Sequence, residues 1–179
     1  LCEALELNTA SQLQVLDLAD NLIGQKEEVS EMREGYVTGG EALGAMLAAS
    51  STLTVLDLSW NSIRGTSAKA LASALKANAT LTVLNLSHNR LDEDGGVAVA
   101  DALEANTSLT EVRMAHCFIG AKGAIVLSQA LTERNTPLSV VDFAGNVPGK
   151  VGAAALLRAV RSLRGATDLK LIGCDCGRI

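Results

Sequence analysis

The 179-residue chain is poor in aromatic residues, prolines and histidines, with one Trp, one Tyr, two Phe, two Pro and two His. Leucine, valine and alanine must therefore provide nearly all of the packing, and at 48% apolar residues the chain has enough for one hydrophobic core. That composition excludes ordinary disorder. A basic excess is also lacking, because the net charge is −5, and this argues against nucleic-acid binding.

The chain also lacks long apolar runs and has few cysteines. No run approaches the ~18 residues of a membrane span, and no signal-peptide pattern opens the chain. Four cysteines are too few for a disulfide scaffold and fit a reducing compartment. The composition thus predicts a cytoplasmic protein that binds neither nucleic acid nor membrane.

One pattern recurs along the chain: leucine, two residues, leucine, one residue, leucine, two residues, asparagine. It begins first at Leu13, and later copies begin at Leu53, Leu81, Leu109, Leu138 and, in degenerate form, Ala166. The period is 28 residues, with one insertion of 12 residues in the first copy and one of a single residue in the fourth. Six copies predict a repeat architecture.

Each copy combines a strand with a helix. The alternating core of the pattern predicts a short strand with inward apolar pairs: Leu16/Leu18, Leu56/Leu58, Leu84/Leu86, Val112/Met114, Val141/Phe143 and Leu169/Leu171. The second half predicts helices with these core-facing sets: Ala42/Leu43/Met46/Leu47, Ala70/Leu71/Ala74/Leu75, Ala98/Val99/Ala102/Leu103, Val126/Leu127/Ala130/Leu131 and Ala155/Leu156/Ala159/Val160. Because strands stack ~4.8 Å apart and helices ~8–10 Å apart, the stack must curve with its strands inside.

This repeat resembles the leucine-rich repeat family, and its length and helical half look most like the ribonuclease-inhibitor-like subclass. The resemblance spans essentially the whole chain. It implies an α/β solenoid in a horseshoe arc, with parallel strands on the concave face and helices on the convex face. Residues 1–179 are expected to form a single such domain of about six repeats.

One polar column follows the strands and is expected to form a structural ladder: Asn21, Asn61, Asn89, Cys117, Asn146 and Cys174. Inward side chains at this place can hydrogen-bond to loop backbone groups that would otherwise lack partners. Cysteine replaces asparagine at this column in the family that the repeat resembles. Two repeats separate Cys117 from Cys174, which is too far for a disulfide, and the lone Cys174-x-Cys176 pair is a poor zinc site.

Outward residues of successive strands form further columns, and we expect these to make the contact surface. The predicted partner-binding residues are Asp17, Asp57, Trp60, Asn85, His88, Arg113 and His116. Trp60 is the only tryptophan, a residue type enriched at interface hot spots, although it could instead merely cover its own strand. The acidic residues in the first half of the sheet predict a partner with a basic surface.

Two histidines occupy the same column in adjacent repeats, so His88 and His116 are expected ~5 Å apart. Two ligands are fewer than a stable zinc site requires, and we predict rim residues rather than a metal site. A hydrolase arrangement of Asp57, Ser87 and His88 is disfavoured because neighbouring strand residues point to opposite faces and no nucleophile elbow is present. Neither phosphate-binding glycine fingerprint occurs. No enzyme activity and no cofactor are predicted.

The least regular segment is the insertion near residues 25–39, which is charged and contains the only tyrosine. Such an insertion can be a binding loop or a solvated excursion. Asn78 and Asn106 begin formal glycosylation motifs but are interpreted as turn residues. Residues 1–5 match the tail of a repeat helix, and no closing helix follows the sixth strand, which predicts a piece of a longer array.

These observations favour a scaffold that binds a partner protein on its concave sheet. The resemblance also leaves open a GTPase activator like the Ran GTPase-activating proteins, a ligand-sensing or autoinhibitory module of a NOD-like receptor, and a cytoskeletal or flagellar scaffold. The sequence does not identify the partner, because repeat scaffolds use one fold for unrelated tasks.

Overall fold

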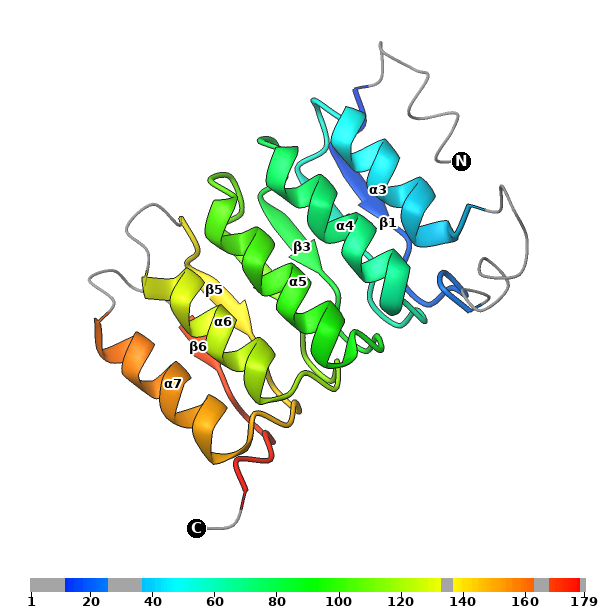
Figure 1. The fold of residues 1–179 in the computed structure, drawn as a ribbon. Coiled ribbons are helices and arrows are strands. Elements are labelled where there is room, and N and C mark those ends of the chain that lie inside the picture. Colours follow the sequence, from blue (N-terminus) through cyan, green and yellow to red (C-terminus); the bar gives the residue numbers. More distant parts are fainter. Residues whose placement is uncertain (1–11, 26–36, 133–136, 163–167, 178–179) are drawn as a thin grey trace.

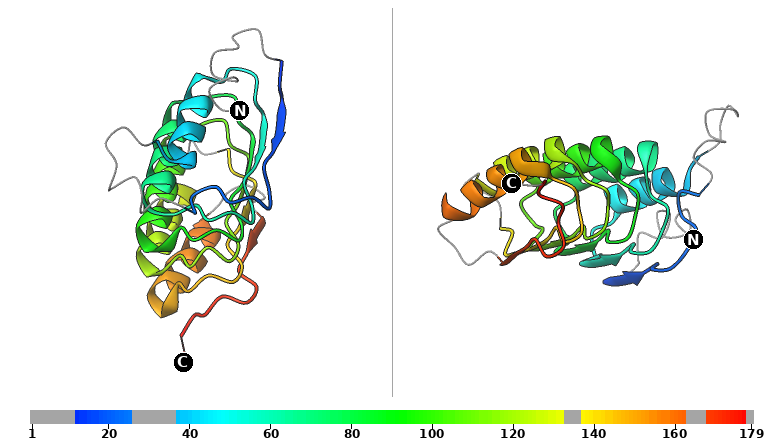
Figure 2. Two further views of the ribbon diagram at one scale, coloured as in Figure 1. Left: turned by 90° about the vertical axis from the view of Figure 1, so that its right-hand side faces the viewer. Right: turned by 90° about the horizontal axis from the view of Figure 1, so that it is seen from below.

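A computed structural model describes residues 12–25, 37–132, 137–162 and 168–177. Strands and helices alternate in the order β1 (Val15–Asp17), α3 (Gly39–Ala49), β2 (Val55–Asp57), α4 (Gly65–Ala77), β3 (Val83–Asn85), α5 (Asp92–Ala105), β4 (Glu111–Arg113), α6 (Ala121–Thr132), β5 (Val140–Asp142), α7 (Gly149–Ser162) and β6 (Asp168–Lys170). The helices lie side by side in one layer (Figure 1). The strands form the other layer, on the inner side of the arc (Figure 2). The predicted α/β solenoid is therefore confirmed.

The sheet is parallel throughout and its strands are paired in chain order, from β1 to β6. Equivalent repeat positions face one another, so that Leu56 pairs with Leu84 and Leu84 with Val112. The extra residue in the fourth copy leaves this register intact, because Val112 still pairs with Val141. Each repeat therefore presents the same positions to the same surface.

The core lies between the two layers and is built from the inward strand residues. Leu56, Leu84 and Val141 are essentially inaccessible to solvent, and Phe143 is among the largest fully buried side chains. The terminal strands are less covered, since Leu16 and Leu169 are only half-buried. Burial of such side chains contributes ~1.5–3 kcal/mol each and is the main stabilisation of the stack.

The buried stripe of the helices is shifted from the predicted one and also includes Ala68, Ala72, Ala100 and Ala124. The second, third and fourth members of each predicted set are buried in α3 to α6, whereas the first members, Ala42, Ala70, Ala98 and Val126, are half-buried. The expectation for Val160 is wrong, because its side chain is exposed although Leu131 at the equivalent place is buried. A further repeat covers Leu131, whereas α7 is the last helix in the part of the chain that the structure describes.

Side-chain caps define several helix ends. Thr38 and Glu41 form a capping box at the start of α3, in which each side chain bonds to the backbone N–H of the other residue. Asn78 and Asn106 follow α4 and α5, where each amide donates to two backbone carbonyls of the preceding repeat or turn. Their Oδ1 atoms accept backbone N–H groups of the turn ahead, so both are buried turn residues.

Two expectations fall on residues outside the described ranges. Most of the insertion, residues 26–36, and the predicted helix tail at residues 1–5 are among them. No helix of the described residues is long and apolar enough to cross a membrane.

Candidate functional site

The sheet surface turned away from the helices, here called the strand face, carries only the first and third residue of each strand. The first residues form a column of four valines interrupted by Glu111 and ended by Asp168: Val15, Val55, Val83, Glu111, Val140 and Asp168. Val15 is 58% exposed, and the next three valines are half-buried. The sequence analysis did not select these valines, although their column was visible in the repeat, and they give the strand face an apolar stripe.

The third strand residues have a structural role that the sequence analysis missed. In four repeats an Asp or Asn there accepts the backbone N–H of the residue two positions later: Asp17, Asp57, Asn85 and Asp142. In these four repeats the side-chain bond stabilises the turn at the end of the strand. The sequence signal is Asp or Asn two residues before Ala or Ser, as in Asp57-Leu-Ser59.

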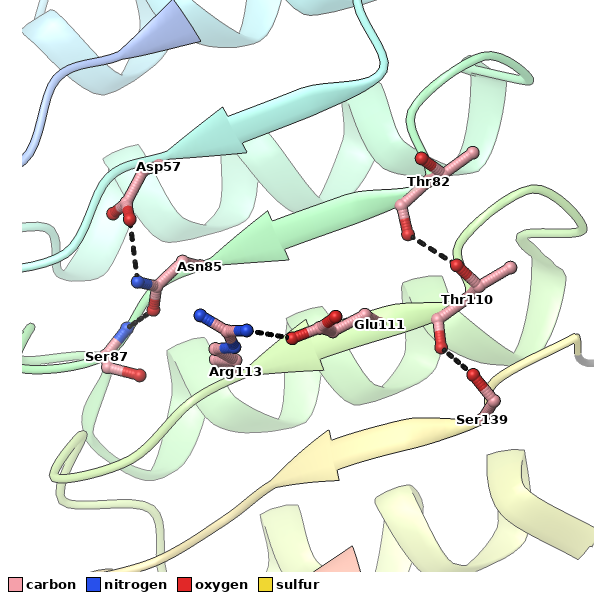
Figure 3. A network of polar contacts seen from close by, with 8 residues as sticks. All are labelled: Asp57, Thr82, Asn85, Ser87, Thr110, Glu111, Arg113 and Ser139. Atoms are coloured by element: carbon pink, nitrogen blue, oxygen red, sulfur yellow. Dashed lines mark hydrogen bonds and ion pairs between the residues drawn. The ribbon is translucent and has the colours of Figure 1, made fainter. Parts of the chain in front are cut away.

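Asp57 and Asn85 also join neighbouring repeats. Asn85 Nδ2 donates to Asp57 Oδ2 over 2.9 Å (Figure 3). The Ser59 hydroxyl donates to Asp57 Oδ1 over 2.6 Å. Burial alone would raise the pKa of Asp57, but the hydrogen bonds from Ser59 and Asn85 lower it below its ordinary value. Asp57 is thus a charged and firmly positioned acceptor on the strand face.

Arg113 occupies the third strand position in the fourth repeat and cannot form this side-chain turn, because an arginine side chain does not accept hydrogen bonds. The N–H of Ala115 bonds instead to the Ser87 hydroxyl of the preceding repeat. The Arg113 guanidinium pairs with Glu111 on its own strand at 2.5 Å, on the strand face (Figure 3). Half of the Arg113 side chain remains exposed, so its charge is oriented and accessible.

A column of hydroxyl groups lies just before the strands. Thr54, Thr82, Thr110 and Ser139 each donate to a backbone carbonyl of the preceding repeat, and the last two bonds are drawn in Figure 3. These bonds fix the register of the strand face.

The column that holds Trp60, His88 and His116 lies in the turn beyond each strand. The prediction that these three are outward strand residues is wrong, because each strand ends at its third residue. All six members have left-handed backbone: Asp20, Trp60, His88, His116, Gly145 and Gly173. Glycine occupies this conformation readily, but three consecutive repeats place a large ring there.

Those three rings stack on one another. The centroids of Trp60 and His88 are 3.8 Å apart, and those of His88 and His116 are 4.7 Å apart, both nearly parallel. The His116 ring lies over Gly145, since a Cβ built there would meet His116 Cε1 at 2.3 Å. Burial, and next the neighbouring His116, lower the pKa of His88 below its ordinary value of 6.5. We call Trp60, His88 and His116 the ring stack.

The asparagine column hydrogen-bonds to loop backbone from inside the turns. Asn89 Nδ2 donates to the carbonyls of Leu58 and Leu86, and its Oδ1 accepts the N–H of Ile63. Asn61 and Asn146 make the same kinds of bond, to both their own and the preceding repeat. Asn21 is exposed, and its bonds among the described residues are to carbonyls of its own turn.

At two positions of this column a thiol takes the place of the amide. Cys117 Sγ donates to the Leu86 carbonyl at 3.1 Å, and Cys174 Sγ to the Phe143 carbonyl at 3.2 Å. Burial raises the pKa of Cys117 to about 12, so this thiol is not a nucleophile at neutral pH. Both residues are free cysteines, as is the exposed Cys176. No cluster of three or more metal-ligating side chains occurs within the described ranges.

A shallow cavity of about 320 Å³ opens beside the ring stack. Its lining comes from the turns of four consecutive repeats: Gln25, Asn61, Ser62, Arg64, His88, Asn89, Arg90 and Phe118. Ser62, Arg90 and Phe118 share one repeat column, directly after the asparagine column, and this column was not among those selected from the sequence.

The structure therefore groups the predicted site residues in three places. Asp57 and Asn85 are bonded together, Trp60, His88 and His116 are stacked, and Arg113 pairs with Glu111. Asp17 bonds within its own turn.

Comparisons with known proteins support the repeat assignment. The leucine-rich repeat family model matches residues 49–72, 77–100 and 105–128. Among solved structures, actin-binding site 2 of leiomodin-1 aligns at 21% identity with a TM-score of 0.68, covering 90% of this chain and 86% of that one. The C-terminal domain of tropomodulin from Caenorhabditis elegans aligns at 14% identity with a TM-score of 0.67, covering 90% and 89%. No curated protein matches the sequence.

The three matched stretches are leucine-rich repeats, and the two structures show that the chain shares the fold of those domains. The ribonuclease-inhibitor-like subclass stays a prediction.

Proposed function

We propose, for a chain that folds as a leucine-rich repeat solenoid, that the strand face and the ring stack bind a partner protein. The role is recognition rather than catalysis. One observation supports this proposal: apolar and charged side chains gather on the strand face and the ring stack, where contacts within the protein fix their positions. The valine stripe supplies apolar area, Arg113 is paired with Glu111, and Trp60 is 59% exposed while stacked on His88.

Such a surface loses little conformational entropy on binding. Asp57 and Asn85 are hydrogen-bonded to each other, and the strand register is fixed by the hydroxyl column. When side chains are already ordered before binding, less conformational entropy is lost on association, and the affinity is higher. Trp60 and Arg113 are also of the residue types that dominate binding energy at interfaces.

The proposal includes a partner with a basic surface that contacts the first half of the strand face. Asp17 is exposed and Asp57 is half-buried, and both carboxylates accept hydrogen bonds within their turns. Two carboxylates positioned in this way can steer a basic partner during association. We place this interaction in the cytoplasm, in keeping with the free thiols of Cys117, Cys174 and Cys176.

Actin is the first partner to test, because the leiomodin-1 structure that shares this fold is an actin-binding site. At 21% identity the likeness concerns the fold alone, so binding must be measured on this chain.

The test is quantitative capture of partners by the wild-type chain and a triple variant, Val55→Ser, Trp60→Asn and Arg113→Gln. Asn is chosen at Trp60 because it tolerates left-handed backbone. Capture from cell extract identifies the partner, and the affinity is then measured with that partner purified, with actin run in parallel. We expect the triple variant to bind at least ~30-fold more weakly, since two hot-spot side chains are removed.

The matched control is Val151→Ser with Leu157→Asn and Arg158→Gln, three exposed residues of α7. These changes remove similar groups from the helical layer and should leave the affinity unchanged. Equal binding by the wild type and the strand-face variant, with both proteins folded, would contradict the proposal.

A further inference from the structure

Trp60 is the first ring of the ring stack, and one face of its indole is open. His88 stacks on the other face at a centroid separation of 3.8 Å, and within the described ranges no second ring contacts Trp60. The Trp60 side chain remains 59% exposed. Because His88 belongs to the following repeat, the open face of the indole is the one turned toward the first repeat.

Asp20 holds the equivalent place in the first repeat. Its N–H donates to the carbonyl of Ser59, directly before Trp60, at 3.0 Å, and the N–H of Trp60 makes the same bond to Ser87. Asp20 and Trp60 both have left-handed backbone, with φ of 56°. Asp20 therefore precedes Trp60 in the column as Trp60 precedes His88, which places its carboxylate beside the open face of the indole.

The surroundings of this indole face are acidic. Asp20 is exposed, and among the described residues its carboxylate has neither an ion pair nor a side-chain hydrogen bond. Asp17 and Asp57 end the strands of the same two repeats. The described residues before Arg64 include no lysine or arginine. An aromatic face bordered by negative charge attracts a cationic group.

An arginine side chain fits this arrangement better than a lysine. Its guanidinium is planar and can lie flat on an indole while its edge donates to a carboxylate, whereas an ammonium group is compact and more strongly hydrated. The ring behind the indole does not repel a cation, because burial and the neighbouring His116 lower the pKa of His88 below 6.5 and leave it neutral at pH 7.

We propose that an arginine side chain of the partner protein stacks on the open face of Trp60 and donates hydrogen bonds to the carboxylate of Asp20. The guanidinium then continues the ring stack toward the first repeat as a fourth planar group. This inference rests on the proposed protein-binding function and names the residue that the basic partner presents. Asp17 and Asp57, whose Oδ1 atoms are bonded within their turns, add attraction at a distance.

The probe is a capped peptide of two glycines, arginine and two glycines. It is compared with the same peptide carrying citrulline, which has a similar shape and no charge, and with one carrying lysine. Trp60 is the only tryptophan of the chain, so its fluorescence and the NMR signal of its indole N–H report on this site alone. We expect saturable shifts, with an affinity about tenfold higher for arginine than for citrulline and an intermediate affinity for lysine.

Asp20→Asn and Asp168→Asn form a matched pair, because both remove one exposed carboxylate, the second at the other end of the sheet in β6. Asparagine also tolerates the left-handed backbone of Asp20. The first change should weaken the arginine peptide about fivefold and leave the citrulline peptide unchanged, and the second should affect neither.

Three results would overturn the inference. The first is equal affinity of the arginine and citrulline peptides, and the second is equal weakening by the two aspartate changes, which would mean that only net charge matters. The third concerns the insertion, which contains Lys26 and Arg33. If replacing both by glutamine raised the affinity for the arginine peptide, the chain's own cations would occupy the indole face.

The two proposals fail separately. Loss of partner binding in the strand-face variant, with no preference for the arginine peptide, retains the proposed function and removes this site. Peptide binding that depends on Asp20, with partner capture unaffected by the strand-face changes, removes the proposed function and retains the site.

Discussion

Single polar side chains join the turns of consecutive repeats. Asn89 is only 3% exposed and holds carbonyls of its own turn and of the preceding repeat. Its amide therefore substitutes for water at groups that the fold has buried. The same kind of joint recurs at Asn78 and Asn106, on the helix side of the repeat, which the sequence analysis identified only as turn residues.

Asn89→Ala should lower the free energy of unfolding by about 3 kcal/mol, because buried carbonyls and the Ile63 N–H lose their partner. Asn21→Ala is the matched control at the equivalent repeat position, where the side chain is exposed and bonds within its own turn. It should cost about 0.5 kcal/mol or less. Urea unfolding of the two variants measures the difference, and equal losses would contradict the proposed role of burial.

The ring stack makes a specific prediction for pH. His88 should titrate below 6.5, because burial and the neighbouring His116 disfavour its charged form. His116→Asn removes one of these causes and should raise the His88 midpoint, which NMR titration of the ring protons measures directly.

The sign for stability follows from proton binding. Below about pH 6.5 the unfolded chain protonates this histidine more fully than the folded chain does, so acidification through that range lowers stability. Replacing His88 by Asn should remove this part of the pH dependence. A His88 midpoint above 6.5 in the wild type would show that the stack does not disfavour the charge.

At the level of elements, the distance between neighbouring helices depends on glycines that contact the loop before the next helix. Ile119 lies against both α5 and α6, because a Cβ built on Gly96 or on Gly123 would meet its Cγ2 at 2.6 or 2.4 Å. Glycine is therefore required for close approach, even though it weakens an isolated helix by up to ~1 kcal/mol relative to alanine. At these two positions the close packing against Ile119 matters more for stability than the low helix propensity of glycine.

Gly123→Ala should destabilise the protein by about 1–3 kcal/mol, since the added methyl group cannot fit beside Ile119. Ser73→Ala on the exposed side of α4 is the control and should be neutral or slightly stabilising. Thermal unfolding compares them, and stabilisation by both changes would mean that Ile119 moves aside at little cost.

For the whole molecule, the sequence was sufficient to predict what depends on periodicity. The 28-residue spacing and the inward leucines such as Leu56 and Leu84 predict the parallel sheet and its core, because every repeat must bury the same face. The alternating apolar residues of each repeat predict where each strand lies but not the residue at which it ends. Each strand ends at its third residue, such as Asp57, and Trp60 and His88 lie in the turns beyond their strands with left-handed backbone.

The features that were missed depend on which columns come together in space. The cavity places Arg90 and Phe118, which share one repeat column, beside Arg64 and His88 from other columns, and half-buried valines lie on a strand face whose composition had suggested mainly charge. These groupings depend on which side chains lie close together in the folded protein, and the repeat period alone does not predict that.

The uniform register between neighbouring strands has a consequence for how such a molecule can change in length. Within the described ranges, the hydrogen bonds between repeats connect neighbouring repeats, from the paired strands to the bond that Asn106 donates to the Leu75 carbonyl. A whole unit could thus be duplicated or excised in a gene without altering the chemistry of any remaining joint. The reach of the molecule can then be adjusted in steps of one strand, while the partner-facing groups already present keep their positions relative to one another.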